Sequence, residues 1–389
     1  MNKATAIDLV ERARALAPLI RQEADEIERT RRLTEPVVTA LVENGLYRAL
    51  LPKSLGGAEV PLATFMQMQE EIAKADASTA WCLGQCSVCA VISAYIDHDA
   101  ADEIFNTKQG ILAWGAINHD VRAEPGGYRA NARWEFASGV RQASWLGAHV
   151  RITEADGTPR RKPDGSPEIR TILFPLSSAT LYDVWDVIGL RGTGTDSYSV
   201  DNLFIPEKFA ALRDEPSALR EKGPLYKIPT NAIYSMGFAA TSLGVARAQF
   251  DAAIELARKK TPQGLSAMKD NSAVQALIGL TEAKLRRARA YLFATAAEVW
   301  DDLVRGPFTE SHRVALRLAA TSSIHQSTEI VDTAYHMAGA TAVFRANGLE
   351  RRLRDMHAIN QQLQARDTHY EEMGKAILSG NLAGPPTSR

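Results

Sequence analysis

The sequence has no excess of charge of either sign and no conspicuous apolar run, and both deficits exclude classes of protein. Its 389 residues include 45 basic and 46 acidic side chains, which give a formal net charge of -1. Such a balance lacks the basic surface that nucleic acids and anionic membranes attract. No apolar run reaches transmembrane length, and the opening MNKATAIDLVERARAL lacks a signal pattern. We therefore expect a cytoplasmic protein with neither nucleic acid nor membrane as a partner.

Cysteine is scarce as well. The three cysteines, Cys82, Cys86 and Cys89, lie in the apolar stretch WCLGQCSVCAVISAY. Their i, i+4, i+7 spacing places them on one face of one helix, where buried thiols act as small apolar side chains. A metal site of this spacing lacks the second pair of soft ligands that structural zinc and iron–sulfur sites use. The sequence therefore predicts no metal site.

A dinucleotide-binding fingerprint is also missing, although residues 185–207, WDVIGLRGTGTDSYSVDNLFIPE, are rich in glycine. The fingerprint opens a helix, whereas Gly189, Gly192 and Gly194 lead into a β-prone run that ends at Pro206. A phosphate or flavin contact must then come from amides and hydroxyls of a turn. The candidate hydroxyl donors are Thr193, Thr195 and Ser197.

The chain divides into three regions with different sequence patterns. Helical periodicity marks residues 6–49, 62–74 and 78–105, and long alanine-rich helical segments return after residue 223. Between them, β-branched residues and turn signals predict the strands YRANARWEFASG, GAHVRITEA, IRTILFPL and YSVDNLFIP, with a polar hairpin in TEADGTPRRKPDGSPE. The predicted units are an N-terminal α-helical domain (1–109), a central β-domain (110–222) and a C-terminal helix bundle (223–389).

This order, with IGLRGTGTDSYSVDNLFIPE and GLERRLRDMHAINQQLQARDTHYEEMG, resembles the acyl-CoA dehydrogenase superfamily over essentially the whole chain. The resemblance implies an α+β, acyl-CoA-dehydrogenase-like fold: N-terminal helices, a central β-barrel or sandwich and a C-terminal four-helix bundle, assembled as a homotetramer. Within the superfamily, GGYRANARWEFASGVRQASW is more similar to the two-component (group D) flavin-dependent monooxygenases, such as dibenzothiophene monooxygenase and related hydroxylases. The Trp-Ile-Thr/Ser-Asn run of the dehydrogenases is missing.

The choice between the two branches depends on a base. A dehydrogenase of this superfamily needs a carboxylate against the flavin to remove the α-proton of a thioester. At the corresponding place this sequence has Leu363 between Gln362 and Gln364, and TSLGVAR on the bundle helix offers no carboxylate either. The resemblance therefore favours a monooxygenase that transfers oxygen from a C4a-hydroperoxyflavin to a small cyclic or aromatic substrate. Reduced FMN, with FAD as the alternative, would come from a separate NAD(P)H-dependent flavin reductase.

Two alternatives stay open. One is an acyl-CoA dehydrogenase-type flavin oxidoreductase that acts on a CH–CH bond with its base elsewhere. The other is a non-catalytic binding protein with a flavin fold, because many monooxygenases place a histidine where this chain has Cys89 and where it has Gln362.

The resemblance also suggests site residues. Candidate catalytic positions are Gln362, Cys89 and Ser138. His119 is a further candidate because it is a histidine near these segments, although a lone histidine is more often structural. The candidate flavin-binding residues are Asn118, Ser138, Gly139, Trp145, Arg191, Thr193, Gly194, Thr195 and Lys260. Lys260 corresponds to an arginine that reaches a neighbouring subunit's cofactor, although a solvated lysine at a helix end explains it equally well. Likewise, Asn118 is equally well a loop residue, and Trp145 a sheet residue that fills the core. Arg354 and Asp355 are expected to form an ion pair that sets the loop carrying Gln362.

Overall fold

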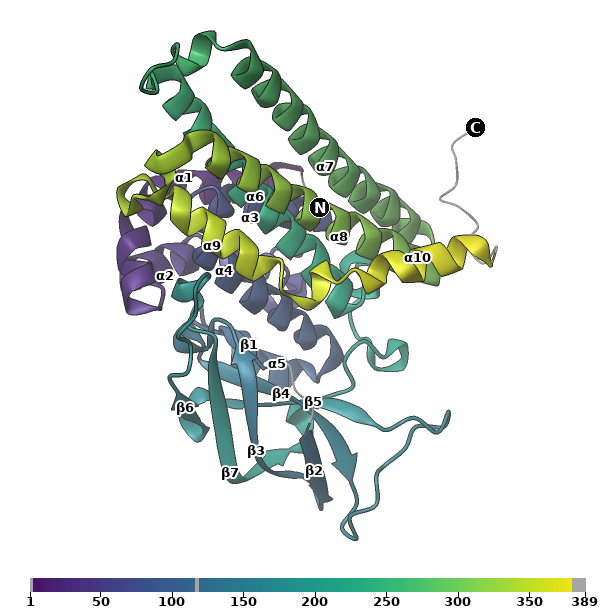
Figure 1. The fold of residues 1–389 in the computed structure, drawn as a ribbon. Coiled ribbons are helices and arrows are strands. Elements are labelled where there is room, and N and C mark those ends of the chain that lie inside the picture. Colours follow the sequence, from purple (N-terminus) through teal and green to yellow (C-terminus); the bar gives the residue numbers. More distant parts are fainter. Residues whose placement is uncertain (1–2, 116–118, 380–389) are drawn as a thin grey trace.

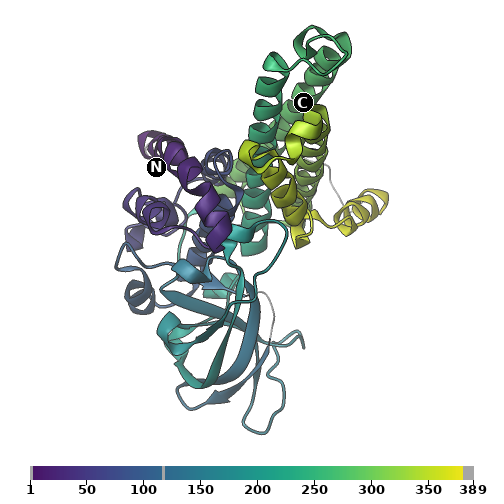
Figure 2. The same ribbon diagram turned by 60° about the vertical axis from the view of Figure 1, so that its left-hand side comes forward.

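The computed structural model describes residues 3–115 and 119–379. Two groups of helices lie side by side above a β-sheet (Figures 1 and 2). The α-helices of the described N-terminal region are α1 (Lys3–Thr30), α2 (Glu35–Glu43), α3 (Leu62–Ala73), α4 (Ala77–Cys89) and α5 (His98–Phe105).

Helix α4 lies in the centre of the protein. The Asp76 carboxylate caps its N-terminus by accepting a 2.7 Å hydrogen bond from the Thr79 amide, and every α4 residue except Gln85 is buried. The segment Ala77–Tyr95 is long and apolar enough to cross a membrane, but 94% of its most apolar window is buried inside the protein. The prediction that no apolar run reaches this length is therefore wrong. The apolar composition is that of a core helix.

The described strands form one mixed sheet in the order β6-β7-β3-β2-β4-β5-β8, with β1 paired to β4. Strands β5 and β7 are far apart in this order, yet the rings of Phe174 (β5) and Tyr198 (β7) are 6.2 Å apart, and both lie near the fully buried Trp134. The sheet therefore curls around an aromatic core. Its strands are β1 (Leu112–Trp114), β2 (His119–Glu124), β3 (Gly127–Ala137), β4 (Trp145–Thr153), β5 (Ile169–Pro175), β6 (Thr180–Tyr182), β7 (Asp196–Pro206) and β8 (Ala210–Ala211).

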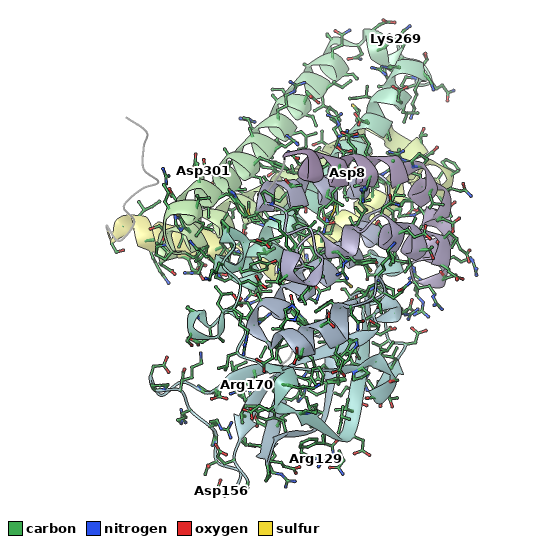
Figure 3. The ribbon with its side chains drawn as sticks, turned by 180° about the vertical axis from the view of Figure 1, so that it is seen from behind. Asp8, Arg129, Asp156, Arg170, Lys269 and Asp301 are labelled. Carbon is green, nitrogen blue, oxygen red and sulfur yellow. The ribbon has the colours of Figure 1, made fainter. Side chains whose placement is uncertain are left out.

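The polar excursion between β4 and β5 is a pair of tight turns, as predicted. Gly157 and Gly165 have φ angles of +86° and +83°, a conformation that glycine adopts without strain. Asp156 and Asp164 stabilise these turns by accepting 2.9 Å bonds from the amides two residues on. Asp156 and Lys269, which follows α6, lie at opposite ends of the molecule (Figure 3).

The C-terminal helices pack around α6, which is buried along most of its length between α3 and α8. Close approach of α3 requires Gly244, because a Cβ there would lie 2.4 Å from the Glu70 carbonyl oxygen. The Glu70 carboxylate binds Arg289 of α7 at 2.9 Å and so joins the two groups of helices. The helices are α6 (Thr230–Lys259), α7 (Ser272–Arg305), α8 (Glu310–Ala338), α9 (Leu349–Ile359) and α10 (Thr368–Leu378).

The predicted fold class is confirmed: helices, a central sheet and a C-terminal helix bundle follow one another along the chain. The four quoted strand segments correspond to β3, β4, β5 and β7. The two- to six-residue strands β1, β2, β6 and β8 were not predicted, because runs this short show little periodicity.

Candidate functional site

A cavity of about 340 Å³ lies where α4, the sheet, α6 and the segment after α9 meet. Its walls are mostly aromatic and amide side chains, the composition of a pocket for a flat organic ligand. The lining residues are Trp81, Gln85, Trp114, Gly115, Phe136, Ser138, His149, Trp185, Leu190, Thr195, Arg213, Asn231, Tyr234, Phe238, Gln362, Leu363 and Gln364.

The helical wall is a stack of aromatic rings. The Trp81 ring of α4 lies 3.7 Å from the Phe238 ring of α6 at an interplanar angle of 5°, and Tyr234 stacks on Phe238 at 5.6 Å. Tyr234 and Phe238 are one helical turn apart, so both project toward α4. This part of the wall is therefore a packed stack of aromatic rings.

A row of hydroxyls adjoins this stack, and two of its members, Ser138 and Thr195, line the cavity. The Trp81 indole donates to Ser138 Oγ at 3.1 Å, and Ser138 Oγ lies 2.7 Å from Thr195 Oγ1. Thr195 Oγ1 is in turn 2.7 Å from Thr193 Oγ1, which donates to the Leu190 carbonyl at 2.8 Å. All three hydroxyl side chains are buried, and we call them the hydroxyl row.

The hydrogen bonds of the hydroxyl row can all be assigned a donor and an acceptor. A hydroxyl carries a single proton, and Thr193 donates its proton to the Leu190 carbonyl. Thr195 therefore donates to Thr193, and Ser138 to Thr195. Ser138 already accepts a bond from Trp81, so its remaining capacity toward the cavity is that of an acceptor.

Two left-handed turns bring the hydroxyl row together. Leu190 and Gly194 flank the turn with φ angles of +52° and +48°, and Gly139 after Ser138 has φ +79°. A Cβ on Gly139 would lie 2.6 Å from Cys86 Sγ, so glycine is required for both conformation and space. As predicted, the glycine-rich stretch is a turn that leads into a strand, β7.

Phe136 lies at the mouth of the cavity in a strained conformation. It has φ +60°, within an irregularity of the β3–β7 pairing, and 57% of its surface is exposed. Positive φ is rare for a bulky aromatic residue and costs about 1–2 kcal/mol. Phe136 thus contributes exposed apolar surface to a cavity that Ser138 also lines.

His149 and Arg213 lie on the sheet side of the cavity, and the sequence did not single out either residue. His149 is buried, its Nδ1 is 2.9 Å from the Thr171 hydroxyl, and its ring contacts Trp114 edge to face at 5.1 Å. Burial, together with the Arg213 charge, holds the pKa of His149 well below its ordinary value, so the ring is neutral. The sequence signal that could have found it is an inward-facing polar residue in a strand, GAHVRITEA.

Gln362 follows α9 and lines the cavity with Leu363 and Gln364. The expected Arg354–Asp355 ion pair is wrong, because neighbouring helical residues point in different directions. Arg354 instead binds Glu350 at 2.6 Å and the Ile188 carbonyl at 2.6 Å. Asp355 accepts a 2.6 Å bond from the Leu190 amide. Both residues thus fix the turn that carries the hydroxyl row.

Cys89 lies behind the wall. Its Sγ is 3.3 Å from the Tyr234 hydroxyl, and burial raises the pKa of the thiol to about 12. Cys82 and Cys86 are buried on the same helix. The described residues hold no group of three or more His, Cys, Asp or Glu side chains that could bind a metal.

The other predicted residues lie elsewhere or outside the description. Asn118 is among the residues that the structure does not describe. His119 contacts Trp134 edge to face, and Trp145 packs on Phe209 at 5.2 Å, so neither lines the cavity. Their functional roles stay predictions.

Arg191 and Lys260 also lie away from the cavity. Arg191 donates to the Val187 carbonyl at 2.6 Å and lines a separate hollow. Lys260 donates to the Ala338 carbonyl at 2.8 Å and to the Thr341 hydroxyl at 2.9 Å at the C-terminal end of α8, where the helix dipole favours a cation. A contact of Lys260 with a neighbouring subunit's cofactor stays a prediction.

None of the described residues that line the cavity is Asp or Glu. The residues outside the description contain neither of these side chains. The cavity thus has no carboxylate to abstract a proton, and its neutral His149 and the cation Arg213 are its titratable groups besides Tyr234.

The walls fit a flavin ring. An isoalloxazine is flat and amphipathic, with polar atoms along its edges. The exposed ring of Phe136 leaves apolar surface to be covered, and Ser138, which lines the same cavity, offers an acceptor. Trp185, held by a 2.9 Å bond from its indole to the Leu190 carbonyl, lines the same cavity.

Comparisons with known proteins identify related chains. Residues 6–104 match the family "Acyl-CoA dehydrogenase, N-terminal domain", and residues 236–366 match "Acyl-CoA dehydrogenase, C-terminal domain". Indole-3-acetate monooxygenase of Pseudomonas putida is 28% identical, over 90% of this chain and 88% of its own. The flavin-dependent monooxygenase oxygenase subunit HsaA of Rhodococcus jostii (strain RHA1) is 29% identical, over 90% and 92%. The structure of XiaF from Streptomyces sp. with FADH2 and glycerol superposes with a TM-score of 0.88 at 22% identity, over 98% and 97% of the two chains.

Proposed function

Because this chain belongs to the acyl-CoA dehydrogenase family, and its curated relatives are flavin-dependent monooxygenases, we propose that it is the oxygenase component of a two-component flavin monooxygenase. It is an oxidoreductase that inserts one oxygen atom into a small aromatic substrate. A separate NAD(P)H-dependent reductase supplies the reduced flavin, as FMN or FAD.

The observation that carries this proposal is the missing carboxylate. Dehydrogenation of a thioester needs a base at the flavin, and no Asp or Glu among the described residues lines the cavity. Leu363 occupies the position where the sequence resemblance places the dehydrogenase glutamate, and it lines the cavity. Oxygen transfer to an electron-rich ring makes no such demand.

The bound flavin supplies the activation of molecular oxygen, and the residues of this chain bind, orient and protect it. The faces of Phe136 and Trp185 are available to the ring system, and Ser138 is available to an N–H group at its edge. The aromatic wall of Trp81, Tyr234 and Phe238 excludes water, which otherwise diverts an activated oxygen species to hydrogen peroxide.

The same wall suits an aromatic substrate. Stacked or edge-to-face contacts with aromatic rings contribute about 0.5–1.5 kcal/mol beyond area burial. Gln85, Asn231 and Gln362 add polar groups that can orient ring substituents. The relatives include an enzyme named for indole-3-acetate, an aromatic compound.

Assembly and location are part of the proposal. We expect a homotetramer in the cytoplasm, with the reductase as a transient partner that delivers flavin by diffusion. Light scattering measures the oligomeric state directly. If the protein is a tetramer, the predicted contact between Lys260 and the cofactor of a neighbouring subunit can then be tested.

The decisive experiment is rapid mixing of the anaerobically reduced, flavin-loaded protein with oxygenated buffer. A monooxygenase gives a transient absorbing species before oxidised flavin appears, and free reduced flavin is the control. Direct reoxidation would contradict the proposal. In that case, anaerobic bleaching of the oxidised protein by acyl-CoA thioesters would identify a dehydrogenase, and flavin binding without either reaction would identify a non-catalytic binding protein.

A further inference from the structure

Arg213 is the one lysine or arginine among the described residues that line the aromatic cavity. It follows β8, lines the cavity, and only 19% of its side chain is exposed. A half-buried guanidinium gains from hydrogen-bond acceptors, since a charge that loses water without gaining partners is costly.

Within the described part of the chain, Arg213 has one ion-pair partner, Asp214, and no acceptor for a hydrogen bond from its guanidinium. Its nearest carboxylate is that of Asp214, 3.7 Å from Nε, which is too long for a hydrogen bond. The other Asp214 oxygen accepts bonds from the Thr230 amide at 2.9 Å and from the Thr230 hydroxyl at 2.6 Å. Asp214 is thus a helix cap for α6 rather than a strong partner for the guanidinium.

The same contacts hold Arg213 in place. Asp214 has φ +61°, and its two bonds to Thr230 tie this left-handed residue to the start of α6. The guanidinium carbon lies 5.5 Å from the Trp114 ring centre, a cation–π contact that orients the side chain without neutralising it. Trp114 in turn lies against Gly147, where a Cβ would come within 2.9 Å of its ring.

The remaining polar groups on this side of the cavity do not neutralise the charge. His149 is neutral, since burial and the Arg213 charge both hold its pKa low. In the ranges 3–115 and 119–379, no Asp or Glu lines the cavity. Arg213 thus faces the cavity, whereas its ion-pair partner Asp214 does not line it, and aromatic walls of low dielectric strengthen the interaction of such a cation with an anionic ligand.

We propose that the substrate is an aromatic acid whose carboxylate binds the Arg213 guanidinium. This inference rests on the proposed function, because it names the substrate class of the same site. A planar carboxylate matches the two-pronged donor geometry of arginine, and the ring of the same molecule would lie among Trp81, Tyr234 and Phe238. Arg213 is then the residue that determines specificity for an acid over a neutral analogue.

The test compares acids with their amides. The flavin-loaded protein is titrated by calorimetry with benzoate, phenylacetate and indole-3-acetate, and with the three corresponding amides, which have nearly the same shape without the charge. We expect at least one acid to bind about 10- to 100-fold more tightly than its amide, the range for a hydrogen-bonded charge in a buried site. If no acid exceeds its amide, the inference is overturned.

Arg213→Met keeps the length of the side chain and removes the charge. We expect it to abolish the preference for the acid while amide binding changes less than about threefold. Arg213→Lys keeps the charge but lacks the two parallel N–H donors of a guanidinium, so it should retain part of the preference for the acid over the amide. The matched control is Arg170→Met, since Arg170 also lies over an aromatic ring, that of Tyr128 at 5.6 Å, but does not line this cavity.

The affinity for reduced flavin shows whether Arg213 binds the carboxylate of the substrate or the phosphate of the cofactor. If Arg213→Met weakens binding of reduced FMN as much as binding of the acid, Arg213 holds the cofactor phosphate and the inference is overturned. Binding is measured independently of turnover. A protein that prefers acids but forms no transient species with oxygen would refute the proposed function and leave the assignment of Arg213 intact.

Discussion

The two polar parts of the cavity wall are built in opposite ways. The hydroxyl row of Ser138, Thr193 and Thr195 is neutral, and each member hydrogen-bonds to the next. In the other part, the Arg213 guanidinium has a 3.7 Å ion pair with Asp214 and, among the described residues, no hydrogen-bond acceptor. The comparison teaches that a network with all its hydrogen bonds made fixes the shape of a site, whereas a charged side chain with free hydrogen-bond donors can bind a ligand.

The stability of the protein should be more sensitive to a substitution that disturbs the backbone at the hydroxyl row than to one on the Arg213 side of the cavity. Gly139→Ala forces a Cβ to within 2.6 Å of Cys86 Sγ at φ +79°. We expect a loss of about 3 kcal/mol in the free energy of unfolding, from strain and overpacking together. Urea denaturation measures it. Gly126→Ala is the control, because Gly126 has φ +81° and no atom within 4 Å of a new Cβ. Equal losses would show that strain alone matters.

On the opposite side, His149 should make stability depend on pH. Its folded-state pKa is depressed, so the unfolded chain takes up the proton first as pH falls below the ordinary histidine value of about 6.5. The His149 contribution is thus present above that pH and lost below it, by about 2 kcal/mol at pH 5. His149→Gln should remove this part of the pH dependence in unfolding measured between pH 5 and 7.5.

The control for that measurement is His119→Gln, which removes a histidine from the same sheet but outside the cavity. If both variants change the pH dependence equally, the effect does not come from the buried site. Asp355 contributes with the opposite sign, because burial raises its pKa to about 7 and its stabilising effect is lost as pH rises. The wild-type-minus-variant difference isolates His149 from it.

Removing one hydroxyl should have a smaller effect. Ser138→Ala leaves the Trp81 indole without its acceptor and Thr195 without its donor. A hydrogen bond of this kind contributes about 1 kcal/mol, so we expect product yield per NAD(P)H to fall about fivefold while hydrogen peroxide rises. Ser144→Ala is the control, since that hydroxyl bonds to the Gln109 carbonyl away from the cavity. Unchanged coupling would indicate that the flavin does not contact Ser138.

The smallest effect concerns the strained residue at the mouth. Phe136→Gly should raise the free energy of unfolding by about 1 kcal/mol, because glycine adopts φ +60° without cost. The same change should weaken flavin binding, because it removes an exposed ring face. Phe136→Ala also removes the ring but keeps the strain, so only the glycine variant should be stabilised. Thermal unfolding with and without flavin tests both effects.

The sequence predicted one side of the cavity better than the other for a physical reason. The glycine-rich turn with its threonines and the Phe-Ala-Ser-Gly segment are local motifs, so a single stretch of chain carries each signal. Trp114, His149 and Arg213 come from three separate segments, and each looks like an ordinary residue in its own. Only the sheet pairing of β1 with β4 brings the first two together.

Family resemblance had a similar limit. It identified Gln362, which lines the cavity, but also Cys89, which lies behind Tyr234. A single sequence predicts the helix on which Cys89 lies. Whether its side chain reaches the cavity depends on the size of the residues that lie between the helix and the cavity. Lys260 was expected from a contact between subunits, and within this chain it caps α8.

The cavity is assembled from segments far apart along the chain, from Trp81 in α4 to Gln364 after α9. Closing such long loops costs entropy before any contact compensates for it. Helices and turns can form from local contacts, but the ligand site exists only once the sheet and both groups of helices have docked. During refolding, the far-ultraviolet signal should therefore recover before flavin binding does, and a newly made chain acquires its site only after its last helices have been synthesised.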